Sequence, residues 1–373
     1  MSTVTVRPLR SKKDEKVFIK FQWKPYAGNP YWVPPLLMDR RKLMDREHNP
    51  FYKHADAEFF LAERNGEVVG RIGAIVNHNH NREHNENIGF FGFFECFDDQ
   101  EVASSLLDEA VRWLKARGVT AVRGPASPSV NDEVGMLVEG FDRSPAILMA
   151  YNPPYYPKLV ETYGFTKIKD LYSWGLHQDK VFTDKLVRVS EAAKQRQGLV
   201  FRSFNMKDFD AEVKRVHELY SRGWIHNWGE VPLTDEEFNY MAKDLKAIVN
   251  PEFVCFVEVK GTPVGFALAL PDYNIILKGN KRGWLIPAIL RMLFLKKRID
   301  DSRIIMLGVL PEYLNSGIGG VLFYEIARRI TNTGIPRGEA SWVLEDNVMM
   351  NRGAHLLNGE LIKRHRLYQL ELS

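Results

Sequence analysis

The stretch that decides the fold is residues 303–324, RIIMLGVLPEYLNSGIGGVLFY. A run of apolar and β-branched residues stops at Pro311, a short polar turn follows, and GIGG at 317–320 leads into an apolar segment with helical spacing. This order predicts a strand, a glycine-rich turn and the start of a helix. The turn suits a phosphate-bearing ligand, because unpaired N–H groups and the positive end of the helix dipole point the same way.

The spacing of this turn excludes two better-known phosphate loops. A P-loop needs Gly-x-x-x-x-Gly-Lys followed by Ser or Thr, and no such pattern occurs. A dinucleotide-binding fingerprint needs a third glycine after Gly317-x-Gly319 and an acidic residue about 20 positions further on, within a βαβ unit. The turn therefore belongs to neither class.

The whole pattern, a hydrophobic strand ending in VLPEY at 309–313 and then the glycine turn, resembles the coenzyme A pyrophosphate loop of the GNAT (Gcn5-related) N-acyltransferase superfamily. The resemblance implies that the end of the strand pairs with the pantetheine arm and that the loop amides hold the pyrophosphate. It also implies acetyl-coenzyme A or another acyl-coenzyme A as the co-substrate. One side-chain contact is expected to be missing, because Leu314 stands where the family usually has Gln or Arg. The expected coenzyme-binding residues are Leu307, Val309, Leu310, Asn315, Ser316, Gly317, Ile318, Gly319, Gly320 and Asn351.

Composition narrows the class of protein. The net charge is +4, from 51 Lys and Arg against 47 Asp and Glu, which does not indicate nucleic-acid binding. Cys96 and Cys255 lie in apolar, strand-like runs, so we expect both to be reduced and buried, which suits a cytoplasmic location. The first residues lack the apolar core of a signal peptide, and no run of 18 apolar residues exists, so we expect no transmembrane segment.

The order of predicted elements divides the chain. We expect a first domain over residues 1–178, a linker helix over 179–198 and a second domain over 199–373. The second half reads β-α-β-β-β-α-β-α-β, which is what a GNAT domain looks like. The expected fold class is α+β, with two GNAT-like domains, each a mixed, mostly antiparallel sheet flanked by helices.

The first half repeats this plan without the glycine turn. Residues 87–97 take the place of the coenzyme strand, but Asp98-Asp99-Gln100-Glu101 follows, so acidic residues stand where phosphate would. We therefore expect the first half to have lost coenzyme A binding.

Carboxylates on the strand after the glycine helix are candidates for the proton acceptor. In GNAT enzymes this strand and the coenzyme strand splay apart, and the thioester lies in the gap. We expect Glu345, with Glu339 second, to take the proton of the incoming amine. The backbone amide at Leu310 or nearby would stabilise the oxyanion. The alternative is that Glu345, Asp346 and Asn347 only cap the next helix.

The last helix departs from the family pattern. Its start, NRGA at 351–354, matches, but Asn358 stands where the family usually has the tyrosine that protonates the departing thiolate. The acid would then be Tyr324, Tyr368, another residue or none. Asn358 and Gly359 also fit a helix C-terminal turn.

Three histidines, His78, His80 and His84, lie within NHNHNREHNEN at 77–87. Imidazoles suit Zn²⁺, but the stretch is polar throughout and joins two predicted strands. We expect a solvated loop and no metal site.

Residues 278–298, KGNKRGWLIPAILRMLFLKKR, form an insertion whose centre, 284–295, is apolar except for Arg291 and lies between basic clusters. It is either a short helix buried over the substrate cleft or a segment lying on an anionic membrane. Hydrophobicity on nearly all sides is more typical of burial, so we expect burial and no appreciable binding to anionic vesicles. Peripheral membrane contact through residues 278–298 is the alternative.

Together these patterns predict an acyl-coenzyme A-dependent N-acyltransferase. The acyl group would pass directly from the thioester to a small-molecule or lipid-like amine. The rival hypothesis is a non-catalytic acyl-coenzyme A sensor or scaffold, favoured by Leu314 and the missing tyrosine. Glu345 and its neighbours favour the enzyme.

Overall fold

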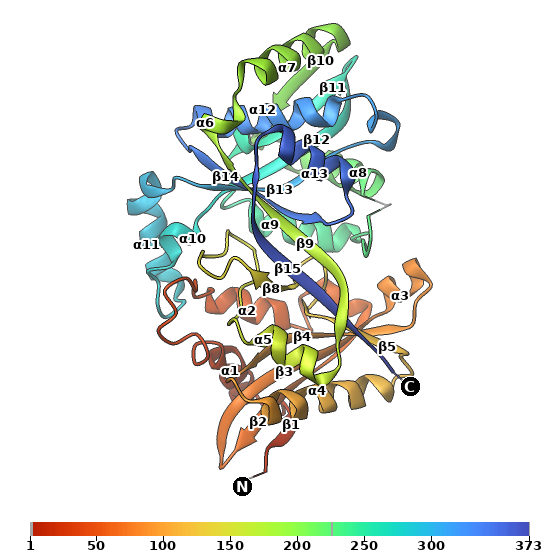
Figure 1. Ribbon diagram of the computed structural model, residues 1–373, viewed down its shortest axis with the longest axis vertical. Coiled ribbons are helices and arrows are strands. Elements are labelled where there is room, and N and C mark those ends of the chain that lie inside the picture. The colour runs from red at the N-terminus through yellow and green to blue at the C-terminus, as the bar shows by residue number, and fades with distance from the viewer. Residues whose placement is uncertain (1–2, 225–226, 373) are drawn as a thin grey trace. The chain divides into compact units, whose positions relative to one another are not determined.

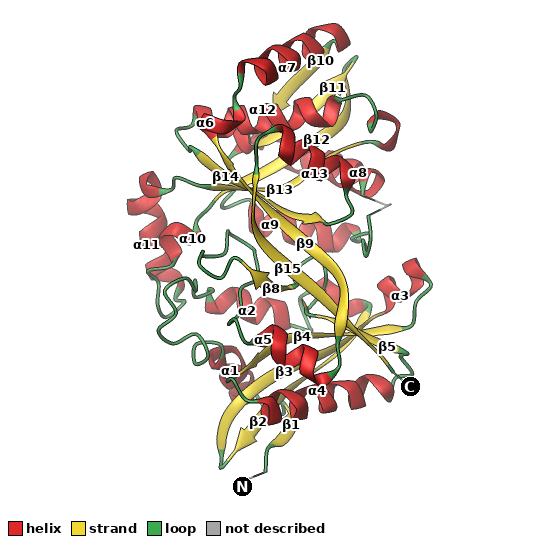
Figure 2. Cartoon of the chain, in the orientation of Figure 1, coloured by secondary structure: helices red, strands yellow, loops and turns green. Residues whose placement is uncertain are grey.

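A computed structural model describes residues 3–224 and 227–372. The chain divides into two compact units, the first made of residues 1–170, 277–290 and 364–373 and the second of residues 171–276 and 291–363. Figure 1 labels the helices and strands, and Figure 2 colours them by type. Each unit combines a mostly antiparallel sheet with flanking helices, so the expected α+β class is confirmed.

The elements of the first part of the chain build the first unit. They are β1 (Thr5–Pro8), α1 (Lys12–Phe21), α2 (Leu37–Met44), η1 (Pro50–Lys53), β2 (Ala55–Arg64), β3 (Glu67–Asn77), α3 (His78–His84), β4 (Ile88–Cys96), α4 (Gln100–Lys115), β5 (Ala121–Gly124), β6 (Ala126–Ser127), β7 (Glu133–Val134), β8 (Met136–Glu139) and α5 (Tyr156–Tyr163). The strands β1 to β5 are neighbours in that order, antiparallel except for the parallel pair β4 and β5.

Local sequence explains the main elements of the first unit. The hairpin between β2 and β3 turns at Asn65 and Gly66, whose φ values of 55° and 77° are those that an Asn-Gly hairpin turn needs. α4 is capped by Asp99, whose side chain accepts a hydrogen bond from the N–H of Val102. The apolar side of α4 packs with the strands into one buried core, which also encloses the free Cys96 as expected.

The second part of the chain begins with a long strand and builds the second unit. Its elements are β9 (Thr166–His177), α6 (Gln178–Val181), α7 (Asp184–Gln197), β10 (Leu199–Ser203), η2 (Met206–Asp208), α8 (Phe209–Gly223), α9 (Asp235–Leu245), η3 (Pro251–Phe253), β11 (Val254–Val259), β12 (Thr262–Pro271), α10 (Asn274–Leu277), α11 (Leu285–Leu295), η4 (Lys296–Arg298), β13 (Ser302–Val309), η5 (Pro311–Tyr313), α12 (Ile318–Asn332), β14 (Arg337–Leu344), α13 (Val348–Leu356) and β15 (Glu360–Glu371). The sheet order is β10-β11-β12-β13-β14-β9. The expected linker is helical and ends at Gly198, but it is interrupted between α6 and α7, where Thr183 caps α7.

Two long strands, β9 and β15, contribute to both units. Residues 171–177 of β9 pair with β14 in the second unit. Residues 368–371 of β15 pair with β5 in the first unit. The units therefore differ from the expected division into 1–178 and 199–373, because an open sheet edge is completed by the strand that can pair with it, whatever its place in the sequence.

The histidine-rich stretch forms a helix, so the expectation of a solvated loop is wrong. Asn77 caps α3 by accepting hydrogen bonds from the N–H groups of Asn79 and His80. The His80 ring is buried and contacts Glu86 at 2.8 Å, and burial lowers the pKa of His80 to about 4. Among the described residues, no group of His, Cys, Asp or Glu has an arrangement that would hold a metal ion.

The apolar insertion also differs from the expectation of burial. It forms α11, and of the residues of this helix only Ala288 is buried, whereas Ile286, Leu293 and Phe294 are among the most exposed large apolar residues described. The prediction failed because an apolar helix buries its side chains only where the fold offers it a surface, and sequence periodicity does not show that surface.

We predict that Tyr368 in β15 stabilises the first unit. Its ring is fully buried in the core of that unit, and its hydroxyl donates to Glu161 at 2.8 Å. Tyr368→Ala should lower the free energy of unfolding by about 3–5 kcal/mol, as for other large-to-small changes of buried rings. Tyr368→Phe should cost only about 0.5–1.5 kcal/mol, because it removes the hydrogen bond alone. Urea denaturation checks both values; an Ala variant as stable as the unmodified protein would contradict the assignment of β15 to this core.

Candidate active site

The sheet of the second unit opens between β13 and β14. These parallel strands pair only at their starts, where Arg303 lies opposite Glu339 and Ile304 opposite Ala340. Further along, β13 continues to pair with β12 and β14 with β9, so the two strands diverge from each other (Figure 2). The divergence begins at Ile305, so the two strands splay apart as the resemblance implied.

The register of β13 decides which backbone groups face the divergence. The N–H of Leu310 donates to the carbonyl of Val264 on the β12 side, with an N···O distance of 2.8 Å. The Leu310 amide is therefore already engaged, which leaves the other part of the expectation, a nearby backbone amide, as the candidate oxyanion donor. Successive N–H groups of a strand point to opposite sides, so the N–H groups of Val309 and Leu307 point toward the side from which β14 has diverged.

α12 begins at the glycine turn and leaves backbone donors open. Gly317 is the N-cap, with a φ of 80° that favours glycine, and has no side chain to cap the helix. Within the described chain, the N–H groups of Gly319 and Gly320 have no hydrogen-bond partner, and a Cβ at either position would meet no atom within 4 Å. Two open donors at the positive end of the helix dipole fit a pyrophosphate.

The other residues of the turn hold its shape. The Oγ of Ser316 donates to the carbonyl three residues earlier at 2.6 Å and accepts from the N–H of Ile318 at 3.2 Å. The side chain of Gln197 donates to the Ser316 carbonyl at 3.2 Å. Leu314 and Asn315 are exposed, and Leu314 offers no polar contact where the family usually has Gln or Arg.

Glu339 lies where the two strands are still paired. It is buried, and its Oε2 contacts the buried Nζ of Lys363 at 2.5 Å. Burial alone would raise the pKa of Glu339, but the Lys363 ammonium lowers it below its usual value. A carboxylate held ionised by an ion pair is a weak proton acceptor, so Glu339 is better suited to fixing the base of the divergence than to catalysis.

Glu345 lies in the turn between β14 and α13. The side-chain amide of Asn351 donates to the carbonyls of Leu344 and Glu345 at 3.0 and 3.2 Å and accepts from the indole N–H of Trp174 at 2.9 Å. These bonds tie the end of β14 to α13, which makes Asn351 a positioning residue for Glu345. The expected cap is Asn347, whose side chain accepts from the N–H of the third helical residue.

The tyrosines considered as general acids have other contacts. The Tyr324 ring packs edge-on against Phe182 at 5.8 Å, on the side of α12 that faces the helices α6 and α7. Tyr368 belongs to the first unit and donates to Glu161. Asn358, in place of the usual tyrosine, has a φ of 52° and donates to the carbonyl of Lys180, as a helix-ending turn residue does.

A third carboxylate, Glu230, is linked to β13 through Tyr220 and Trp224 and was missed in the sequence. Its Oε1 accepts from the Tyr220 hydroxyl at 2.6 Å, and the Tyr220 ring stacks on Trp224 at 5.1 Å. The Trp224 indole lies directly against Gly308 of β13, where a Cβ would stand 2.5 Å from the ring. Burial raises the pKa of Glu230 to about 7. The sequence WGEVP around Glu230 carries no motif that would have indicated this.

The first unit has the same divergence, but its own chain fills it. β4 and β5 pair only over their first residues, and the segment after β5 then lies against β4. The N–H of Phe93 donates to Ser127 Oγ at 2.8 Å, and a Cβ on Gly92 would lie 1.8 Å from the carbonyl of Ala126. The helix that follows is capped by Asp99, which pairs with Arg64 at 2.6 Å. These contacts occupy the positions that correspond to the open strand edge and the open helix donors of the second unit.

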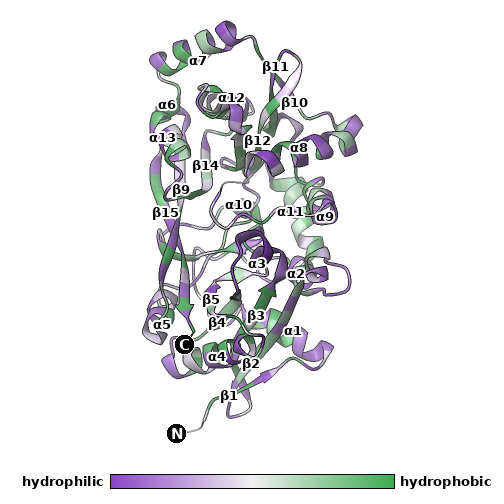
Figure 3. Ribbon diagram, turned by 90° about the vertical axis from the view of Figure 1, so that its right-hand side faces the viewer, coloured by the Kyte–Doolittle hydropathy of each residue, from purple (hydrophilic) through white to green (hydrophobic). Residues whose placement is uncertain are grey.

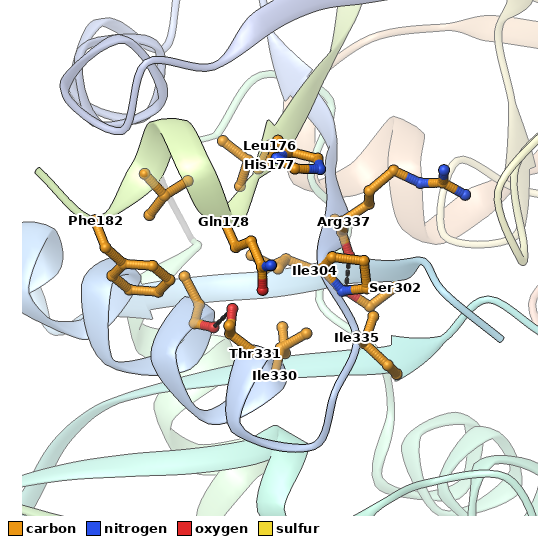
Figure 4. Close-up of a pocket in the computed structure, with 14 residues that line it drawn as sticks. Leu176, His177, Gln178, Phe182, Ser302, Ile304, Ile330, Thr331, Ile335 and Arg337 are labelled. Carbon is orange, nitrogen blue, oxygen red and sulfur yellow. Dashed lines mark hydrogen bonds between the residues drawn. The ribbon is translucent and has the colours of Figure 1, made fainter. Parts of the chain in front are cut away.

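A small pocket in the second unit lies away from these groups (Figure 4). It is lined by the end of β9, by α6, by the starts of β13 and β14 and by the C-terminal half of α12. Ser302 donates to the carbonyl of Arg337 at its edge. None of the expected coenzyme-binding residues lines this pocket, so we assign the coenzyme no place in it.

Comparison with known proteins identifies relatives of the whole chain. A family profile described as "Acetyltransferase (GNAT) family" matches residues 27–130 and 213–352. The chain is 32% identical over 383 residues to a protein of Caulobacter vibrioides named bacterial ceramide synthase, covering 99% of this chain and 98% of the relative. It is 31% identical over 375 residues to Protein YghO of Escherichia coli, covering 98% and 95%.

Solved structures agree on the fold. A tandem GNAT protein from the clavulanic acid biosynthesis pathway superposes with a TM-score of 0.56 at 12% identity, over 99% of this chain and 98% of that one. With the two profile matches, this confirms the expected arrangement of two GNAT-like repeats.

We predict that Gly319→Glu weakens acyl-coenzyme A binding by several-fold to about a hundredfold, on the order of 1–3 kcal/mol, because a carboxylate would repel the pyrophosphate. The fold should survive, since a side chain at this position meets open space. Isothermal titration with coenzyme A measures the effect. Gly319→Ala is the matched control and should bind like the unmodified protein; equal affinity of the Glu variant would contradict the placement of the phosphate.

Proposed function

We propose a reaction for this chain, which belongs to the acetyltransferase (GNAT) family and is a GNAT-type acyltransferase. It transfers the acyl group of an acyl-coenzyme A directly to the amino group of a lipid-like acceptor. The observation that carries the proposal is the divergence of β13 and β14 beside a glycine turn with open N–H donors. It provides an unpaired strand edge for the pantetheine arm and a phosphate site at the start of α12.

The residues of the second unit supply the remaining chemistry. Acyl-coenzyme A supplies an activated thioester carbonyl. The N–H of Val309 stabilises the negative charge on that carbonyl oxygen while the amine attacks. The C–N bond forms, the C–S bond breaks, the amine proton passes to a carboxylate, and the thiolate is protonated from solvent.

We assign the proton acceptor to Glu230. General bases work best with a pKa near the working pH, and the pKa of Glu230 is raised to about 7. The Tyr220 hydroxyl orients its carboxylate, and Trp224 connects this pair to β13. Glu345, the acceptor expected from the sequence, is the alternative that the same measurements test.

The proposal of a lipid-like acceptor rests on the relative named bacterial ceramide synthase, which the chain matches along nearly its full length. A ceramide is the N-acyl derivative of a long-chain amino alcohol. An acceptor of this chemistry would carry a primary amine for transfer and a hydrocarbon chain.

A panel of substrates tests the proposal. The full-length protein is incubated with acetyl- or palmitoyl-coenzyme A and either a long-chain amino alcohol or a short, water-soluble amine. We expect mass spectrometry to show the amide of the long-chain amino alcohol and release of one free thiol per amide. Acylation of the short amine alone would contradict the lipid-like acceptor. Absence of amide from every amine, with intact acyl-coenzyme A binding, would support the non-catalytic binder instead.

We predict that Glu230→Gln lowers kcat by about 10²–10⁴-fold and leaves acyl-coenzyme A binding unchanged, because it removes a general base and no coenzyme contact. In the unmodified enzyme the carboxylate must be ionised, so activity should fall as the pH drops below about 7. The variant should lose this acid limb. Glu345→Gln is the matched comparison; if it shows the larger loss and Glu230→Gln keeps the acid limb, the base is Glu345.

A further inference from the structure

The helix α11 presents its apolar side to solvent. Residues spaced three and four apart share one face of a helix, and on α11 that face is entirely apolar. The most exposed of its side chains are those of Ile286, Leu293 and Phe294, which are 71%, 70% and 78% exposed. The full apolar face consists of Ile286, Ile289, Leu290, Leu293 and Phe294, all exposed. Figure 3 draws α11 in hydrophobic colours.

The opposite side of α11 is the one that faces protein. Ala288 on that side is buried, and the Nε of Arg291 donates to the carbonyl of Ile276 at 2.5 Å. A surface helix of a soluble domain normally turns its apolar side to the core and its charges to water. α11 turns its apolar side to solvent instead, and an exposed apolar face of this kind indicates an interaction site.

Basic residues stand at both ends of the apolar face. They are Lys281 and Arg282 before the helix and Lys296, Lys297 and Arg298 after it, and all are exposed. In the described part of the chain, none of these cations forms an ion pair with a carboxylate. Between them lies Trp284, half exposed, with the guanidinium of Arg282 at 4.9 Å from its ring.

We propose that α11 docks the protein on an anionic lipid surface. The apolar face would enter the boundary between headgroups and acyl chains, Trp284 would lie at headgroup level, and the flanking cations would contact lipid phosphates. The helix lies in the plane of the membrane, because 11 residues extend only about 16 Å, roughly half the hydrocarbon thickness. No helix among the described residues is long and apolar enough to cross a bilayer.

Charge decides between a membrane and a second copy of this chain. Two α11 faces packed against each other would bring together the cations that flank both helices, and like charges in contact are unfavourable. An anionic bilayer satisfies the apolar and the basic parts of the surface together. The inference goes beyond the proposed reaction, because it concerns where the protein binds and uses none of the groups assigned to catalysis.

Flotation of the full-length protein with lipid vesicles tests the proposal. Vesicles of phosphatidylcholine with about a third phosphatidylglycerol are compared with vesicles of phosphatidylcholine alone. We expect binding to the anionic vesicles at 0.05 M salt and strong weakening at 0.5 M, because screening shortens the reach of exposed charges. The variant K296Q/K297Q/R298Q should bind roughly a hundredfold less tightly, from the usual contribution of a basic residue at such a surface.

The apolar face is tested by I286S/L293S/F294S, which should weaken binding by more than tenfold by removing most of the inserted side chains. These side chains are so exposed that the fold should be unaffected, which circular dichroism checks. K12Q/K13Q/K16Q on α1 matches the loss of three charges, and V189S/V200S removes two exposed apolar side chains outside α11; both should bind like the unmodified protein.

The proposal is overturned if anionic vesicles do not bind the protein, or if the α11 variants bind as tightly as the controls. A concentration-dependent dimer that is lost in I286S/L293S/F294S, without vesicle binding, would instead assign the face to a second copy of the chain.

Discussion

The site depends on one constraint, the short pairing between β13 and β14. Two residue pairs join these strands, and one of the paired residues, Glu339, forms a buried ion pair with Lys363. β12 and β9 pair with the other edges of β13 and β14. Past their two paired residues, the described parts of β13 and β14 pair with no other strand along their facing edges, and the Arg303 side chain donates to the Ser341 carbonyl there. The register of β13 then directs the N–H groups of Leu307 and Val309 to the free side. The glycine turn and α12 follow β13 in the chain, so the same strand also positions the open N–H donors at the start of α12.

Comparing the two units shows how the same topology gains or loses a ligand site. In the first unit the divergence of β4 and β5 is occupied by Ala126 and Ser127, and Asp99 caps the following helix. In the second unit Gly317 occupies the capping position and offers no side chain. In the first unit Asp99 accepts from a helix N–H, and Ser127 accepts from the N–H of Phe93. Each of these contacts occupies a backbone donor of the kind that we propose the coenzyme uses in the second unit.

Local signals in the sequence predicted much of this structure. The strand, turn and helix around Gly317, the hairpin at Asn65 and the helix ending at Gly198 each have a short-range cause, and each is confirmed. Three other features depend on contacts that local sequence patterns do not show. They are the pairing of β9 and β15 in both units, the hydrogen bond from the Leu310 amide to Val264, and the raised pKa of Glu230. The exposed face of α11 was missed for a related reason, since hydrophobicity does not reveal what surface is available.

We propose that one of the two similar repeats holds acyl-coenzyme A, because in the other repeat the segment after β5 lies against the diverging strand β4. Isothermal titration of the full-length protein with a non-hydrolysable acyl-coenzyme A analogue measures the stoichiometry directly. We expect one molecule bound per chain. A stoichiometry of two would show that the segment after β5 does not close the first repeat, and no binding would contradict the coenzyme site altogether.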